Sequence, residues 1–293
     1  MATRRSFIKS TSLLSAGFLL APKDFRLKSA LIGLQLYTVR DAMQKDPADT
    51  LSKVAKIGYT SVEGATYTGT QKFYGMDPSA FSKLLKNIGL VMPSSHYRLG
   101  EEKPKGEIMK GTLLHEWDKA VDDAAEVGLK FMVCAFLSPE ERGDLDHYKY
   151  VADQLNIAGE RCKKAAIQLC YHNHDFEFIK QGDKYPYDVL LETDRDLVKM
   201  EMDIYWVTKA GKDPGELIDQ HPGRFPLLHL KDMDNTPQKA FTEVGNGIIN
   251  FKEILKHREK AGLQYFFVEQ DKCPGSPFDS ITQSISYIKK NLI

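Results

Sequence analysis

The sequence predicts an α/β protein with the (β/α)8 architecture of a TIM barrel, and two observations predict it. Eight apolar, strand-like runs recur at intervals of 28 to 40 residues, and a segment with helical periodicity follows each one. Regular alternation of this kind is typical of parallel strands joined by helices, and eight repeats are enough to close a barrel. Four helical segments also end in a glycine directly before the next strand, as expected at a helix C-terminus: Gly58, Gly89, Gly128 and Gly262.

The individual elements are predicted from these two patterns in chain order. The strand-like runs begin near Leu31, Tyr59, Leu90, Lys130, Ile167, Val198, Pro226 and Tyr265. The helical patterns cover Pro47–Ile57, Ser79–Ile88, Thr112–Val127, Tyr148–Ala166, Tyr187–Thr193, Pro214–Asp219, Phe251–Ala261 and Phe278–Asn291.

A doubly wound open sheet is the competing architecture. It would need a glycine-rich phosphate loop after the first strand, but residues 37–40 read YTVR. The connection Arg98–Lys110 is charged and contains proline and glycine, so it is predicted to be a surface loop. No low-complexity linker follows the N-terminal segment, and we therefore expect residues 26–293 to form a single barrel domain.

The N-terminal segment is predicted to be an export signal and leader, residues 1–25. Thr3–Lys9 is basic, and the apolar run Ser10–Ala21 is shorter than the roughly 20 residues that span a bilayer. The adjacent arginines before Phe7 resemble a twin-arginine signal, so we expect a periplasmic protein with no stable membrane insertion once the signal is removed. The alternative is a basic start to a buried helix.

Composition narrows the classes of partner. The formal net charge is zero at pH 7 and 42% of the residues are hydrophobic, which is ordinary for a globular protein. A balanced charge supplies no electrostatic argument for nucleic-acid binding, and we expect none. The four cysteines lie far apart and predict neither a disulfide framework nor a paired metal site. The composition is also compatible with a homo-oligomer.

Metal-capable side chains stand where predicted strands end. In the stretch YHNHDFEF, His172 and His174 lie two residues apart and would point to the same side of a strand. Asp203, His229 and Glu269 end the last three strands. Because active sites of TIM barrels lie at the carboxyl ends of the strands, these residues are candidate ligands of one divalent cation, Mn, Co, Zn or Mg. An ion-pair cluster among barrel-top residues is the alternative.

The chain resembles the sugar phosphate isomerase/epimerase family, which has a xylose-isomerase-like barrel. The resemblance covers Leu31 to the C-terminus and rests on the motifs GLQLYTVRD, GYTSVEG, YHNHDFEF, MEMDIYW, HLKDM, EVGNGIINF and VEQD. It implies one divalent cation held by residues from strands five to eight, which Asp203, His229 and Glu269 match for the last three. The family's first ligand is a glutamate. Here His172 stands at that position, and we favour it over Glu177, which would have to reach back from a loop.

The resemblance also implies a reaction. In the epimerases of this family a cation polarises a carbonyl while an α-proton is abstracted and the enediolate is stabilised. Inosose dehydratases, which are relatives, eliminate water after the same first step, and histidine at position 172 makes elimination or hydration beside the ketone of a 3-keto-glycoside the alternative. The candidate catalytic residues are Glu269, His172, His174 and Lys231. A barrel that binds sugar without catalysis is the alternative from another class.

The substrate is expected to be a small carbohydrate. No phosphate cradle or basic cluster is visible, which favours a neutral sugar, a keto sugar or a keto-glycoside. Trp206 is either a sugar platform or a core aromatic, and Glu63 either touches substrate or supports a residue that does. Lys199 and Glu201 are predicted to pair inside the barrel. The candidate substrate contacts are Gln35, Tyr37, Glu63, His96, Glu177, Trp206 and Lys231.

Overall fold

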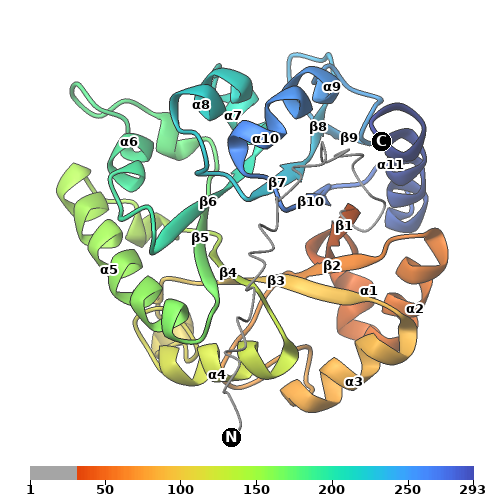
Figure 1. The fold of residues 1–293 in the computed structure, drawn as a ribbon, viewed down its shortest axis with the longest axis horizontal. Coiled ribbons are helices and arrows are strands. Elements are labelled where there is room, and N and C mark those ends of the chain that lie inside the picture. Colours follow the sequence, from red (N-terminus) through yellow and green to blue (C-terminus); the bar gives the residue numbers. More distant parts are fainter. Residues whose placement is uncertain (1–31) are drawn as a thin grey trace, which may run out of the picture.

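The computed structural model describes residues 32–293, which form a closed barrel of parallel strands with helices around it (Figure 1). Each barrel strand pairs with the barrel strands that precede and follow it in the chain, and β1 closes the ring against β10. The TIM barrel predicted from the sequence is therefore confirmed. The predicted export signal and leader lie outside the described residues.

The barrel strands match the eight predicted runs in number and order. They are β1 (Ile32–Gln35), β2 (Ser61–Gly64), β3 (Val91–Tyr97), β4 (Phe131–Cys134), β5 (Gln168–His172), β6 (Val198–Asp203), β7 (Leu227–Leu230) and β10 (Tyr265–Val268). A short antiparallel pair, β8 (Asp232–Met233) and β9 (Phe241–Thr242), follows β7 outside the barrel.

Helices follow the strands as the periodicity predicts, and short 3-10 turns lie in the loops after several strands and between α9 and α10. The α-helices are α1 (Arg40–Lys45), α2 (Pro47–Ile57), α3 (Pro78–Ile88), α4 (Trp117–Val127), α5 (Leu145–Lys164), α6 (Pro186–Leu191), α7 (Ile204–Lys209), α8 (Pro214–Gln220), α9 (Phe251–Ile254), α10 (Arg258–Ala261) and α11 (Pro277–Asn291). The 3-10 turns are η2 (Leu36–Val39), η3 (Pro104–Gly106), η4 (Pro139–Glu141), η5 (Phe176–Phe178) and η6 (Leu255–His257).

Local chemistry sets the ends of the helices. Helix α2 begins where the Asp46 carboxylate accepts a hydrogen bond from the backbone of Asp49 at 3.0 Å, and it ends at Gly58, whose φ is +112°. The predicted helix Thr112–Val127 is too long at its start. Thr112 pairs with His115 in a turn, so α4 begins only at Trp117.

The interior of the barrel has an apolar floor beneath a polar layer. The Phe267 ring fills the centre of this floor because Gly33 on β1 has no side chain, and a Cβ there would overlap the ring. The buried floor consists of Phe131, Val133, Ala135, Cys170, Leu227 and Phe267. Most of the remaining core lies between the outside of the barrel and the helices.

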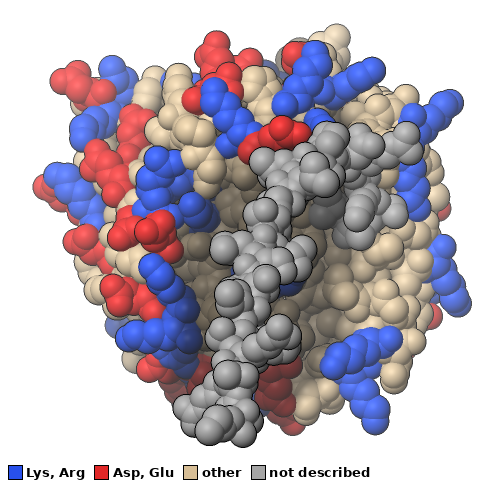
Figure 2. Space-filling view, viewed as in Figure 1, with Lys and Arg blue, Asp and Glu red and all other residues tan. Residues whose placement is uncertain are grey.

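The strand register fixes the level of the polar layer. Gln35 pairs in register with Glu63, His172 with Glu201, and Asp203 with His229. Because the carboxyl ends of parallel strands meet at one end of the barrel, these side chains converge there. Around this face lysine and arginine lie beside aspartate and glutamate (Figure 2). Within residues 32–293 no helix is long and apolar enough to cross a membrane.

Candidate active site and metal centre

The polar layer is centred on the Glu201 carboxylate, which three imidazoles surround. Glu201 Oε2 lies 2.9 Å from His96 Nε2, 3.0 Å from His172 Nδ1 and 3.3 Å from His229 Nε2. The four residues come from β3, β5, β6 and β7, and Glu201 is fully buried. Sequence reasoning predicted instead that Glu201 pairs with Lys199. That prediction is wrong, because Lys199 Nζ donates to the backbone oxygen of Gly223 at 3.0 Å.

Glu63 on β2 contacts the same nitrogen of His229 as Glu201 does. Its Oε2 atom is 2.6 Å from His229 Nε2 and 3.2 Å from His96 Nε2, and it accepts a hydrogen bond from Gln35 Nε2 at 2.8 Å. The second oxygens of Glu63 and Glu201 are buried and have no hydrogen-bond partner in the described chain. Gln35, Glu63 and His96 therefore belong to the buried layer beneath the cavity as much as to a substrate surface.

An acidic cluster lies above this layer, at the carboxyl ends of β6, β7 and the strand before Glu269. His229 Nδ1 is 3.0 Å from Glu269 Oε2 and 4.0 Å from Asp203 Oδ2. Lys231 is buried among the carboxylates, with its Nζ 2.6 Å from Glu269, 3.1 Å from Asp203 and 2.9 Å from Asp271. Asp271 is a member of this cluster that sequence reasoning missed. The motif VEQD contained it.

Two sets of side chains have the spacing of a metal site, and both use His229. One set is Asp203, His229 and Glu269, and the other is His96, His172, Glu201 and His229; in each, the ligand atoms lie within 4.8 Å of one another. His172 belongs to the second set, and its Nε2 atom lies 3.7 Å from Asp203 Oδ2, so it also borders the first set. Carboxylate oxygens and imidazole nitrogens suit a divalent cation, and both sets supply them within buried surroundings. The residues present therefore fit the cation expected from the sequence.

The histidines of the polar layer and of the cavity above it differ in the direction in which their surroundings shift their pKa. Burial alone lowers the pKa of a histidine, but the carboxylates of Glu201, Glu63 and Glu269 raise the pKa of His229 well above its usual value. Burial and the charges of neighbouring groups lower the pKa of His172 well below its usual value. Burial, followed by the charge of Lys231, lowers the pKa of His174 to about 3, so its imidazole is neutral at pH 7.

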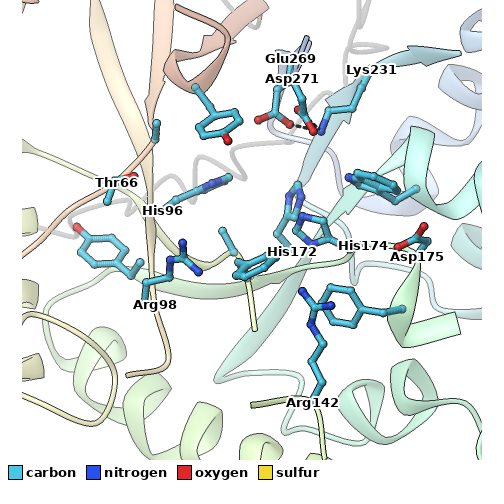
Figure 3. A pocket seen from close by; sticks show the side chains of 17 residues that line it. Thr66, His96, Arg98, Arg142, His172, His174, Asp175, Lys231, Glu269 and Asp271 are labelled. Carbon is cyan, nitrogen blue, oxygen red and sulfur yellow. Dashed lines mark ion pairs between the residues drawn. The ribbon is translucent and has the colours of Figure 1, made fainter. Parts of the chain in front are cut away.

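A cavity of about 450 Å³ opens above the polar layer, within the range of small-molecule sites. His174 faces it with its Nδ1 atom unpaired in the described chain, stacked on Phe176 with 5.4 Å between ring centroids. Trp206 lines the same wall, 5.4 Å from His174. The lining also includes the predicted residues Tyr37, His96, His172, Lys231 and Glu269 (Figure 3).

Two predicted substrate contacts occupy other positions. Tyr37 was expected on the first strand, but it lies in the turn η2 at the lip of the cavity and is 41% exposed. Glu177 is buried beside the cavity. Its carboxylate accepts hydrogen bonds from Tyr171 Oη at 2.7 Å and from the backbone of His174 at 2.8 Å, so it supports the His174 loop.

Two arginines that sequence reasoning missed line the cavity. Arg98 follows β3 and Arg142 follows η4, so they are 44 positions apart in the chain and meet only through folding. Both guanidiniums lie against the ring of Phe136, at 4.7 and 4.9 Å from its centroid. The basic groups that the sequence did not reveal are therefore present, at the end of the cavity away from Lys231 (Figure 3).

Comparison with known proteins shows which family the chain resembles as a whole. The family model described as xylose isomerase-like TIM barrel matches residues 51–291. An inosose dehydratase of Clostridium beijerinckii is 24% identical over 262 residues, covering 77% of this chain and 86% of that protein. An inosose dehydratase of Geobacillus thermodenitrificans is 25% identical over 273 residues, covering 82% of this chain and 88% of that protein.

Solved structures are similar as well. A sugar phosphate isomerase/epimerase from Parabacteroides distasonis is 29% identical, with a TM-score of 0.75 over 89% of this chain and 94% of that one. The IOLI protein, solved with a zinc atom, is 14% identical, with a TM-score of 0.68 over 88% of this chain and 96% of that one. The second comparison supports the fold alone.

Proposed function

The chain belongs to the xylose isomerase-like TIM barrel family, and on that premise we propose that it is a divalent-metal-dependent enzyme of the isomerase/epimerase type. It acts on a sugar or keto sugar by abstracting the proton α to a carbonyl and stabilising the enediolate. One observation carries the proposal: Asp203, His229 and Glu269 converge beneath a cavity of about 450 Å³ that is lined by Glu269 and by the neutral imidazole of His174.

Asp203, His229 and Glu269 would hold the cation, with His172 as the fourth ligand, because its Nε2 atom lies 3.7 Å from Asp203 Oδ2. A divalent cation supplies Lewis acidity that polarises a carbonyl oxygen. Glu63 orients the ligand set, since its carboxylate lies 2.6 Å from His229 Nε2 and leaves His229 Nδ1 directed at Asp203 and Glu269.

His174 is the base that this geometry supports best. Its pKa of about 3 keeps the ring neutral at pH 7, the residue lines the cavity, and its buried Nδ1 atom has no hydrogen-bond partner in the described chain. Glu269 is already engaged by Lys231 and His229, whose charges hold its pKa well below the usual value despite burial. Lys231 therefore holds Glu269 in place and provides positive charge beside an oxygen that becomes anionic.

Elimination or hydration beside a ketone, as on a 3-keto-glycoside, is the second candidate. It is favoured by histidine rather than glutamate at position 172, which leaves fewer carboxylates to exchange protons on both faces of one carbon. Similarity to proteins named inosose dehydratases supports the same alternative. We also propose that the enzyme is exported to the periplasm by the basic and apolar segment at residues 3–21.

Proton exchange tests the proposal. The purified protein, loaded with Mn, Co or Zn and quantified by elemental analysis, is incubated in heavy water with a 3-keto-glucoside, an inosose and free ketoses. We expect deuterium at the carbon beside the ketone by NMR, and a 1,2-unsaturated product would identify the lyase. His174→Gln is expected to lower exchange by roughly 10²–10⁴-fold with metal content unchanged.

The matched control is His257→Gln, since His257 pairs with Asp219 on the surface away from the cavity. It should leave both exchange and metal content unaltered. Absence of exchange with every substrate and every metal contradicts the enzyme proposal and favours a barrel that binds sugar without catalysis. Exchange that survives His174→Gln contradicts only the choice of base.

A further inference from the structure

The cavity has two ends of opposite charge. Glu269, Asp271 and Lys231 gather at one end, and Arg98 and Arg142 lie at the other, with the histidines between them (Figure 3). The first end belongs to the cation site already described. The arginine end takes no part in the reaction proposed above. Its positive charges could bind a negatively charged group of a ligand.

Both guanidiniums are held in place by contacts that leave donors free. Arg142 packs over the Phe176 ring at 3.7 Å, and its Nε atom donates to the backbone oxygen of Leu137 at 2.7 Å. Its two terminal nitrogens form no hydrogen bond or ion pair within residues 32–293. Arg98 packs against the Phe136 ring, and its buried Nη1 atom forms no hydrogen bond in the described chain and lies 4.0 Å from Glu102 Oε2.

Carboxylates near the cavity are engaged elsewhere. Glu269 and Asp271 contact Lys231, and Asp175 lies 3.7 Å from Lys209. The ion pair of Arg98 with Glu102 spans 4.0 Å between side chains that are each about one-third exposed, so it contributes little. Within the described chain no carboxylate therefore forms an ion pair shorter than 4.0 Å with either guanidinium, although burial raises the pKa of Glu177 and the charge of Arg142 acts to lower it.

We propose that Arg142 and Arg98 bind a carboxylate on the substrate, so that the enzyme acts on an acidic keto sugar rather than a neutral one. This inference rests on the proposed function and specifies its substrate. The free terminal nitrogens of Arg142 form the planar fork that matches a carboxylate in a bidentate pair. A phosphate is less well served, because the N-terminus of α5, three residues after Arg142, is already capped by the Asp144 side chain, which accepts a hydrogen bond from the backbone of His147 at 3.0 Å.

The arrangement also orients the substrate. Phe136 touches both guanidiniums, and its ring centroid lies 5.4 Å from that of His174. One aromatic ring therefore separates the anion site from the proposed base. A sugar whose carboxylate is bound by Arg142 would lay its ring across Phe136 and His174 with its other end toward Asp203 and Glu269. Binding at one end would thus select which carbon faces His174.

Binding of matched monosaccharides tests the inference without requiring turnover. The full, metal-loaded chain is titrated by calorimetry with D-glucuronate, D-glucose 6-phosphate and D-glucose. We expect D-glucuronate to bind at least tenfold more tightly than D-glucose. Arg142→Gln and Arg98→Gln should each weaken D-glucuronate binding roughly ten- to hundredfold, the range for a lost charge-assisted hydrogen bond, and leave D-glucose binding unchanged.

Two controls separate recognition from folding and from net charge. Lys164→Gln removes the same charge at the far end of α5 and should change nothing. Arg142→Lys keeps the charge but loses the fork, so it should fold normally and recover only part of the preference for D-glucuronate. Melting temperature and metal content are measured on every variant.

Equal affinity for D-glucuronate and D-glucose in the wild-type protein overturns the inference, as does a preference for D-glucuronate that survives both glutamine substitutions. If the arginines increase the affinity for D-glucose 6-phosphate, relative to D-glucose, more than they increase the affinity for D-glucuronate, the assignment of a carboxylate is overturned. These outcomes are distinct from failure of the proposed function. Proton exchange on neutral keto sugars can succeed while this test fails, and arginine-dependent binding can be found where no exchange occurs.

Discussion

Glu63→Gln is expected to weaken cation binding, because Glu63 sets which nitrogen of His229 is available to a metal. The Oε2 atom of Glu63 lies 2.6 Å from His229 Nε2, and both side chains are fully buried. When His229 gives up the proton that its Nδ1 shares with Glu269 at 3.0 Å, a proton kept on Nε2 leaves the lone pair on Nδ1. Glutamine retains an acceptor but loses the charge, so the hydrogen bond to His229 falls from about 1.5–3 to about 0.5–1.5 kcal/mol.

The loss of about 1–1.5 kcal/mol corresponds to a cation affinity roughly tenfold weaker, at the lower end of the usual effect of changing a residue that orients a metal-binding histidine. The assay is a competition titration of the metal-free protein with Zn or Mn against a chelating dye. Glu243→Gln is the matched control, since Glu243 is also a buried glutamate but accepts a hydrogen bond from Ser280, outside the site. That variant should bind the cation as the wild type does.

His96→Gln and Asp203→Asn decide between the two candidate ligand sets. His96 belongs only to the set around Glu201, and Asp203 only to the set with Glu269. We expect Asp203→Asn to weaken binding far more than His96→Gln. The reverse order, or unaltered affinity in Glu63→Gln, would refute the reasoning, because the cation would then be bound by His229 through Nε2 or without help from Glu63.

Three further predictions concern stability and the N-terminus. Burial raises the pKa of Glu177 to about 7 from an ordinary 4.5, so the folded protein retains this proton longer than the unfolded chain as the pH rises. Its contribution to the free energy of unfolding is therefore greatest below the unfolded pKa and declines between about pH 4.5 and 7. Urea titrations should show that Glu177→Gln removes this decline. An unchanged slope of the free energy of unfolding against pH would contradict the prediction. Glu141→Ala should cost about 2–4 kcal/mol, because the buried Glu141 carboxylate accepts hydrogen bonds from the backbone of Gly100, Glu101 and Ser138, whereas Glu140→Ala at its exposed neighbour should cost little; equal effects would argue against this anchor. Deletion of residues 1–21 should leave the melting temperature unchanged by calorimetry, and a loss of several degrees would show that the segment packs on the barrel.

Residues at strand ends were predictable because two local rules suffice for them. Alternation along a strand and the location of TIM-barrel sites at the carboxyl ends of strands were enough to select His172, Asp203, His229 and Glu269. In the structure these side chains do gather at that end of the barrel. Whether they bind a cation stays a prediction.

The predicted pairing of Glu201 with Lys199 was wrong because the side chains that contact Glu201 come from neighbouring strands. Along β6, Lys199 shares a face with Glu201, but two residues of a strand span about 6.6 Å, while neighbouring strands lie only about 4.8 Å apart. The register pairs Glu201 with His172, and His229 on the next strand is also within reach at 3.3 Å. Register depends on the tilt of all eight strands, so the spacing of residues in one strand does not contain it.

The arginine end of the cavity required knowledge of loop conformation. The connection Arg98–Lys110 was predicted to lie on the surface because of its charge, yet its first residues are tied down by Glu141 from another loop. That carboxylate accepts hydrogen bonds from the backbone of Gly100 and Glu101 in one loop and of Ser138, at the start of η4, in another. The same anchor joins the loops that carry Arg98 and Arg142, whose guanidiniums both lie against the Phe136 ring. A basic cluster can therefore be absent from every local window of a sequence and still be built by one buried carboxylate that joins two loops.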